Sequence, residues 1–205
     1  MSTDPPAGTA PPAKPLRADA RRNRARILTA ADEVFAASGP SASTEEVARR
    51  AGVAIGTVFR HFPAKHHLAE AVFVARLEQL VTEARDGAEA DHPGPAFLSF
   101  VGRWAELSAA KLAVADALTR EGLDVEAAAG DGPYPRVRAE LLEAVGVLLA
   151  RAQEAGAVRP ELGVDEIHAL LVGTARAVEQ LADDEVGRAR VLAVVVDGLR
   201  PPERA

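Results

Sequence analysis

Six residues between positions 55 and 61 have side chains suited to contact with nucleic acid. They are Ile55, Gly56, Thr57, Phe59, Arg60 and His61. A threonine hydroxyl binds a base edge or a phosphate, an aliphatic side chain contacts a thymine methyl, and glycine lets the backbone approach the duplex. His61 and Lys65 are placed to reach phosphates, together with amides at the start of the next helix. The alternative is a helical hairpin inside a larger bundle, with these residues merely solvated.

Residues 44–65 have the pattern of two short helices joined by a tight turn. Thr44 is the expected N-cap of the first helix, and two acidic residues follow it. The apolar face of that helix would comprise Val47, Ala48 and Ala51. Gly52 stands where the backbone must turn, which commonly requires a positive φ. The second helix should begin near Ile55 and end by Pro63, with Val58 filling the angle between the helices. This pattern predicts a helix-turn-helix whose second helix lies in the DNA major groove.

The same stretch resembles the DNA-binding domain of TetR-family transcriptional regulators, over about residues 19–70. The matching residues are Thr44, Val47, Ala48, Ala51, Gly52, Val53, Gly56, Thr57, Val58, Phe59, His61, Phe62, Lys65 and Leu68. Two positions depart from the family pattern. Ala54 stands where the family often has Ser, which removes a capping hydroxyl, and Phe59 replaces the commoner Tyr, which removes a phenolic phosphate contact.

Composition favours helices over strands. The 205-residue chain is 48% hydrophobic and 4% aromatic, and Ala, Val and Leu dominate. We expect an all-α protein with an N-terminal three-helix domain and a C-terminal helical bundle that contains a dimerisation helix pair. The absence of cysteine rules out disulfides and thiolate metal sites. No apolar run approaches the roughly 18 residues of a membrane span, and the N-terminus lacks the apolar core of a signal peptide, so we expect a cytoplasmic protein with no membrane partner.

Charge is divided unevenly along the chain. Residues 1–65 contain ten Lys and Arg against six Asp and Glu, a balance of +4, whereas residues 66–205 contain fourteen against twenty-four, a balance of −10. Positive charge therefore lies on the segment that would meet phosphates.

Three domains are expected: residues 1–18, 19–66 and 67–205. The first has five prolines and should be a disordered, basic arm. The second is the DNA-binding domain, and its first helix should run from about Asp19 to Ser38. Arg21 and Arg24, in the basic run between Lys14 and Arg26, are expected to contact the minor groove or phosphates, although either could simply be solvated.

The resemblance implies that the third segment binds a ligand and dimerises. The expected pocket residues are Phe97, Phe100, Arg103, Trp104, Leu107, Leu142 and Val145. This broad aromatic face could be plain core or a cavity wall, and Arg103 could pair an anionic effector or be solvated. The expected dimer contacts are Leu170, Gly173, Thr174, Ala177, Leu192, Val195 and Val196, on two apolar helices over about residues 164–181 and 186–199.

Together these features predict a homodimeric repressor, released from a pseudo-palindromic DNA operator by a small-molecule effector. An activator, or a ligand-sensing module that acts through a protein partner, are the alternatives. A helical enzyme is not expected, because no convergent carboxylate pair, no nucleophile near a histidine and no phosphate-cradling glycine loop is apparent. No cofactor is expected. No metal site is expected either, because His66 and His67 are adjacent and would point about 100° apart on a helix.

Overall fold

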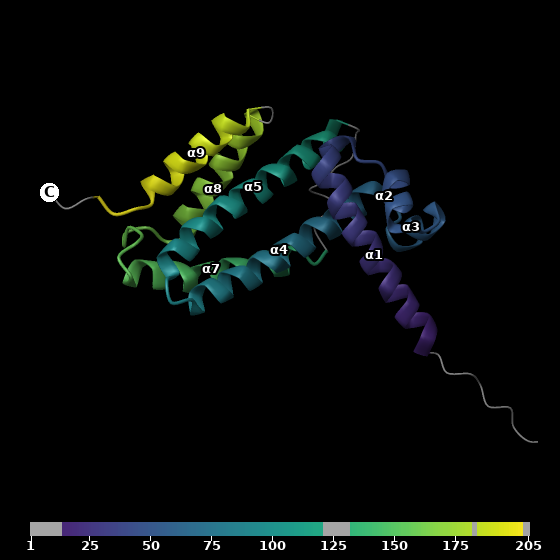
Figure 1. The fold of residues 1–205 in the computed structure, drawn as a ribbon, viewed down its shortest axis with the longest axis horizontal. Coiled ribbons are helices and arrows are strands. Elements are labelled where there is room, and N and C mark those ends of the chain that lie inside the picture. The colour runs from purple at the N-terminus through teal and green to yellow at the C-terminus, as the bar shows by residue number, and fades with distance from the viewer. Residues whose placement is uncertain (1–13, 121–131, 182–183, 203–205) are drawn as a thin grey trace, which may run out of the picture.

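The computed structural model describes residues 14–120, 132–181 and 184–202. All of the regular structure among these residues is helical, which confirms the predicted all-α class (Figure 1). The helices are α1 (Lys14–Ser38), α2 (Thr44–Ala51), α3 (Ile55–His61), α4 (Lys65–Glu89), α5 (Pro93–Arg120), α7 (Tyr134–Glu154), α8 (Val164–Gln180) and α9 (Glu185–Gly198), with a 3-10 turn, η1 (Gly39–Ser41). No helix within those described ranges has the length and apolar character that a bilayer crossing requires.

Three helices have a proline in their first turn, and the first of them begins earlier than predicted. The helix α1 begins at Lys14 rather than Asp19, so residues 14–18 are helical and not part of a disordered arm. The other two, α5 and α7, begin at Pro93 and Tyr134. Proline is tolerated in a first turn, because its missing N–H has no partner there in any case. Residues 1–13 and a predicted helical piece at 123–129 lie outside the described residues.

The first three helices form a small domain, called the head below. Its core contains Ile27, Ala31 and Val34 of α1, Val47, Ala48 and Ala51 of α2, Val58 of α3, and Phe62. Leu68 and Val72 of α4 complete the same cluster, so the start of α4 is part of the head core. Phe62 is buried, as expected of a core aromatic residue, and Phe35 packs against the cluster from its edge.

The remaining helices form a larger bundle, called the body below. Its core runs through α4, α5, α7 and α8 and includes Phe97, Phe100 and Leu148, which are almost fully buried. Figure 1 shows α4 leaving the head and running beside α7, while α8 and α9 form the outer edge of the body. Because α4 contributes to both cores, it is the structural link between the head and the body.

Candidate nucleic-acid interface

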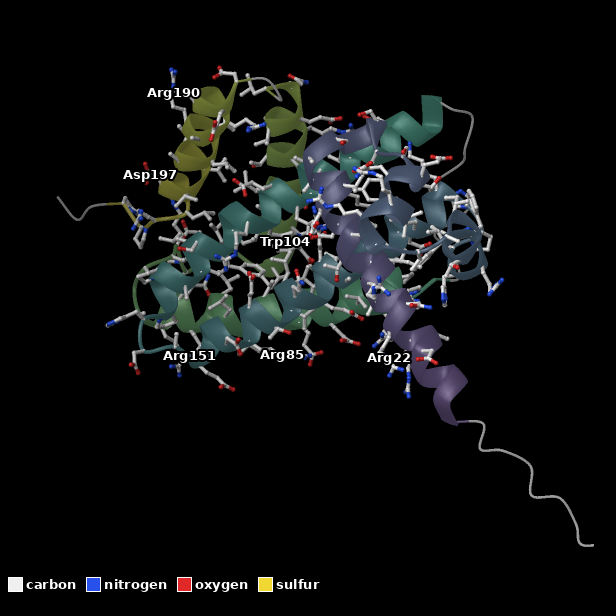
Figure 2. The ribbon with its side chains drawn as sticks, turned by 45° about the vertical axis from the view of Figure 1, so that its right-hand side comes forward. Arg22, Arg85, Trp104, Arg151, Arg190 and Asp197 are labelled. Atoms are coloured by element: carbon white, nitrogen blue, oxygen red, sulfur yellow. The ribbon has the colours of Figure 1, made fainter. Side chains whose placement is uncertain are left out.

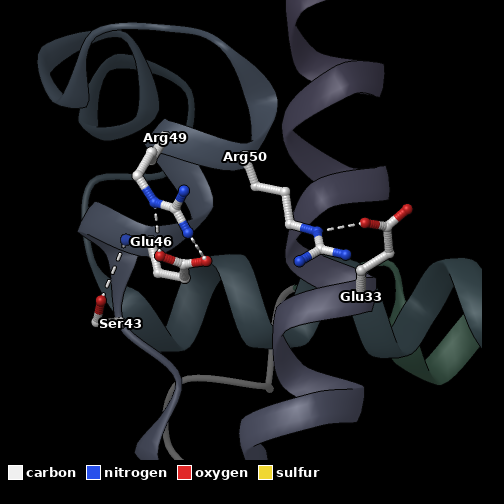
Figure 3. Close-up of polar contacts among 5 residues, drawn as sticks. All are labelled: Glu33, Ser43, Glu46, Arg49 and Arg50. Carbon is white, nitrogen blue, oxygen red and sulfur yellow. Dashed lines mark hydrogen bonds and ion pairs between the residues drawn. The ribbon is translucent and has the colours of Figure 1, made fainter.

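The helix α2 is fixed at its start by Ser43 rather than by Thr44. Ser43 has an extended backbone, and its Oγ accepts a hydrogen bond from the Glu46 amide at 3.1 Å. Thr44 is therefore the first residue of the helix and not its cap. The Glu46 carboxylate binds Arg49 through both oxygens, at 2.9 Å to Nε and 2.5 Å to Nη2 (Figure 3). The hydrogen bond from Arg49 lowers the pKa of Glu46 below its usual value.

A second ion pair joins α2 to α1. Arg50 Nε lies 2.5 Å from Glu33 Oε2, and both side chains are half-exposed (Figure 3). An exposed pair of this kind contributes little stability, about 0–1 kcal/mol. The pair adds to the apolar core contacts that already pack α2 against α1.

The turn between α2 and α3 has the predicted glycine geometry. Gly52 has φ 63° and ψ 40°, and its amide donates to the carbonyls of Ala48 and Arg49. The Val53 amide also donates to Ala48 O, at 3.0 Å. This left-handed turn closes the carbonyl end of α2 and sends the chain into α3. At the start of α3 the capping residue Ala54 supplies no side-chain bond, as its departure from the family pattern implies.

The short helix α3 buries one side chain and exposes most of the others. Val58 is fully buried, whereas Ile55 and Phe59 are 37% and 43% exposed despite being large and apolar. Gly56 and Arg60 are exposed, and Thr57 and His61 are half-buried. A Cβ added to Gly56 would meet no heavy atom within 4 Å, so this glycine is not required by packing inside the protein. The accessible surface of α3 therefore presents apolar, hydroxyl and cationic groups.

The arginines of α1 do not all have the same surroundings. Arg21 is exposed, and it makes no hydrogen bond or ion pair within the described parts of the chain. Arg22 pairs with Asp19 on the end of α1 that projects beyond the head (Figure 2). Arg24 lies over the Phe62 ring at 5.2 Å from its centroid, and Arg26 Nη2 donates to Ala51 O at 2.6 Å. The last two contacts could not be predicted from the sequence, because their partners lie far along the chain.

Comparison with known proteins identifies the helix-turn-helix and the body together. Residues 27–72 match the family described as bacterial regulatory proteins, tetR family, and residues 92–201 match the C-terminal domain of SbtR-like transcriptional regulators. A crystal structure of the TetR transcription regulatory protein from Mycobacterium vanbaalenii is 43% identical, covers 91% of this chain and 100% of its own, and has a TM-score of 0.64. The chain belongs to the TetR family. The predicted family and its DNA-binding role in transcription regulation are thereby confirmed.

Other TetR-family and helix-turn-helix regulators are similar over different lengths. The TetR regulator SCO0520 from Streptomyces coelicolor is 33% identical over 87% of this chain and 98% of its own, with a TM-score of 0.67. The HTH-type regulator UidR of Escherichia coli is 28% identical over 193 residues, 90% of this chain and 93% of UidR. The regulator TtgW of Pseudomonas putida is 42% identical over 69 residues, and the chain spans about half of its length, 52%.

In the TetR-family body, most of the predicted pocket residues are core. Phe97, Phe100, Trp104 and Val145 are buried, while Leu107 and Leu142 pack against them from the edge. Arg103 does not join this group, because its guanidinium is half-exposed and lies 2.7 Å from Glu83 Oε2 on α4. The His168 ring, which sequence reasoning missed, lies 5.9 Å from Trp104.

A separate hollow of about 320 Å³ between the start of α5 and the end of α9 is lined by Pro95, Leu98, Ser99, Ala157, Val196 and Arg200.

The predicted dimerisation helices have an open apolar surface, but Thr174 is not part of it. Thr174 is buried inside the protomer, and its Oγ1 donates to the Leu170 carbonyl at 2.8 Å. Leu170 and Gly173 are exposed, whereas Ala177, Leu192, Val195 and Val196 are partly buried. Val172, Val186 and Val194 are also exposed, although they were not among the predicted dimer contacts. No residue of α9 is buried, although the helix contains five apolar residues in the run from Val191 to Val196 besides Ala193.

Proposed function

We propose that this TetR-family regulator is a homodimeric repressor of a pseudo-palindromic operator, and that a small-molecule effector bound in the body releases it. The observation that carries the proposal is the accessible face of α3. Two large apolar side chains, a glycine without a packing role, Arg60 and His61 lie on a helix held by Val58 and Gly52. Large apolar groups left exposed beside cations favour a binding surface over a solvated one.

In this proposal α3 enters the major groove and its neighbours bind the backbone. Thr57 and Ile55 contact base edges, while Gly56 allows close approach and Phe59 packs on the duplex. The phosphate contacts come from Thr44, Arg60, His61, Lys65 and Arg21. The net charge of +4 on residues 1–65 supports this assignment, because phosphate neutralisation supplies much of the affinity for DNA.

The proposed dimer forms across α8 and α9. Leu170, Val172 and Val194 are exposed together with Gly173, whose lack of a side chain permits close helix approach. A second copy related by a two-fold axis would cover the same surface on each subunit and give a four-helix interface. Two heads related in this way would read an inverted repeat, with half-sites about one helical turn, or a multiple of it, apart.

In the proposed release, the dimer shifts between two conformations that differ in the distance between its two heads. DNA binds one spacing better and an effector binds the other better, so each ligand weakens the other by the same factor. The helix α4 supports this route, because Leu68 lies in the head core and Leu77 lies in the body core on the same continuous helix. A change in the body that displaces α4 would therefore move the head.

To test the proposal, duplexes that bind the purified protein are selected from a random DNA library at two salt concentrations. The molar mass of the free protein is measured separately by light scattering. The proposal expects an enriched inverted repeat and the mass of a dimer. Small molecules are then screened for loss of binding to the selected duplex. Salt-sensitive binding without an enriched site, or a monomer that binds a single half-site, would contradict it.

A further inference from the structure

Two arginines of α1 contact the residues on either side of the recognition helix α3: Arg26 contacts the end of α2 and the turn before α3, and Arg24 contacts the residue after α3. Arg26 Nη2 donates to Ala51 O at 2.6 Å and to Gly52 O at 3.4 Å, just before α3 begins. Arg24 lies over the ring of Phe62, the residue that follows α3. On α1 these two side chains flank the buried Ile27 on opposite sides, as helical positions about 100° apart per residue require. The segments that precede and follow α3 are thus both contacted from one helix.

The contact of Arg26 completes the turn that precedes α3. The last carbonyls of a helix lack intrahelical partners and carry partial negative charge, so a cation that donates to them stabilises the helix end. A Cβ on Gly52 would lie only 2.9 Å from Arg26 Nη2. The guanidinium therefore occupies the space in which any other residue at position 52 would place its side chain. The left-handed turn and the Arg26 contact depend on the same glycine.

The contact of Arg24 fixes the other end of α3. Phe62 is buried, and its amide donates to Val58 O at 2.8 Å, which ends the helix. A guanidinium over an aromatic face within about 6 Å is attracted by the negative face of the ring. The ring is held between the head core on one side and the Arg24 guanidinium on the other.

We infer that Arg24 and Arg26 are positioning residues that set the orientation of α3, and that they do not act mainly by neutralising DNA phosphates. The inference rests on the proposed function only in that α3 reads the operator. It divides the basic run of α1 in two. Arg21, which has no such contact in the described structure, remains a phosphate-binding residue, whereas Arg24 and Arg26 act through the geometry of α3.

Salt dependence separates the two roles. The plot of log affinity against log salt concentration has a negative slope, and loss of one phosphate contact reduces its magnitude by about one. The same loss weakens binding to all duplexes to a similar degree. We expect Arg21→Gln to behave in this way. For Arg26→Gln we expect an unchanged slope and a preference for the selected duplex over a scrambled one that falls about tenfold, as expected when a charged hydrogen bond is lost. For Arg24→Gln the slope should also stay unchanged, and the preference should fall about two- to fivefold, because only a cation–π contact is lost. Lysine at position 26 keeps the positive charge but lacks the planar, forked guanidinium. The preference of Arg26→Lys for the selected duplex should therefore lie between those of Arg26→Gln and the wild type.

A measurement without DNA tests the same inference. In hydrogen exchange on the free protein, Arg26→Gln should speed exchange of the amides in residues 52–62 about tenfold and leave those of α7 unchanged, whereas Arg21→Gln should change neither. The inference would be overturned if Arg26→Gln reduced the magnitude of the salt slope by about one and left the duplex preference unchanged. It would also be overturned if the α3 amides of this variant exchanged at the wild-type rate. If the wild type selects no sequence, the proposed function fails, and exchange still decides whether these arginines hold α3.

Discussion

Arg76 of α4 is bound to Asp32 of α1 through both the side chain and the backbone. Its Nε pairs with the Asp32 carboxylate, and its Nη2 donates to the Asp32 carbonyl at 3.2 Å. Arg76 is only partly exposed, so this contact is better shielded from solvent than the other ion pairs of the head. The head is therefore attached to α4 by a directional contact in addition to the shared apolar core.

Replacing Arg76 should loosen that attachment. We expect Arg76→Gln to lower the free energy of unfolding by about 1 kcal/mol, because a charged hydrogen bond is lost from a partly solvated site. Urea denaturation measures it, and a double-mutant cycle with Asp32→Asn should give a coupling energy of similar size. Arg85→Gln is the matched control, since Arg85 is exposed on the same helix and has no ion pair among the described residues. A coupling energy near zero would contradict the prediction.

Gly52 and Gly56 should respond in opposite ways to alanine. Gly52→Ala places a Cβ at φ 63° and 2.9 Å from Arg26, so we expect destabilisation by about 1–2 kcal/mol. Gly56→Ala meets nothing within 4 Å and should leave stability unchanged or raise it by up to about 1 kcal/mol. The same Gly56→Ala change should nevertheless weaken binding to the selected duplex. Thermal unfolding and mobility shift on both variants test the pair, and equal stabilities would refute the distinction.

Two exposed valines should differ in their effect on assembly. Val194 of α9 is 72% exposed on the proposed dimer surface, and Val147 of α7 is 56% exposed elsewhere. We expect Val194→Asp to weaken the dimer at least tenfold, because it would bury an unpaired charge between subunits. Val147→Asp should leave the dimer intact. Sedimentation over a range of concentrations measures both, and a Val194→Asp dimer as strong as the wild type would place the interface elsewhere.

Two histidines should make the protein less stable in mild acid. Burial, followed by the positive charge of His67, lowers the pKa of His66, while Glu70 opposes the shift. Burial, followed by Arg138, lowers the pKa of His168, while Asp165 opposes it. As the pH falls through the ordinary histidine pKa of 6.5, these two histidines are therefore protonated in the unfolded chain before they are protonated in the folded protein.

The stability that these histidines give is complete above pH 6.5 and declines below it, until the folded-state pKa values are reached. We expect the double variant His66→Gln, His168→Gln to show a smaller fall in the free energy of unfolding between about pH 7 and pH 5, above the range where most carboxylates titrate. The exposed His67, replaced by Gln, is the control. A wild-type profile that stays flat over this interval would refute the assignment.

The sequence alone determined the features that depend on neighbouring residues. The helix-turn-helix was predicted with correct bounds for α3, because Gly52 forces a left-handed turn and Pro63 ends the helix. Helical periodicity likewise located the buried faces around Phe97 and Phe100. These signals are local, since backbone conformation and apolar spacing are encoded within one or two turns of chain.

Tertiary structure decided which partner each face meets. Periodicity placed Thr174 on an apolar helix, but only the packing of α8 against α5 turned it inward. The basic run of α1 was equally uniform in sequence, and the chain had to fold before Arg26 met Ala51, 25 residues away, or Arg24 met Phe62. A guanidinium contributes the same charge in every setting, and its role is fixed by whichever carbonyl, ring or phosphate lies within reach.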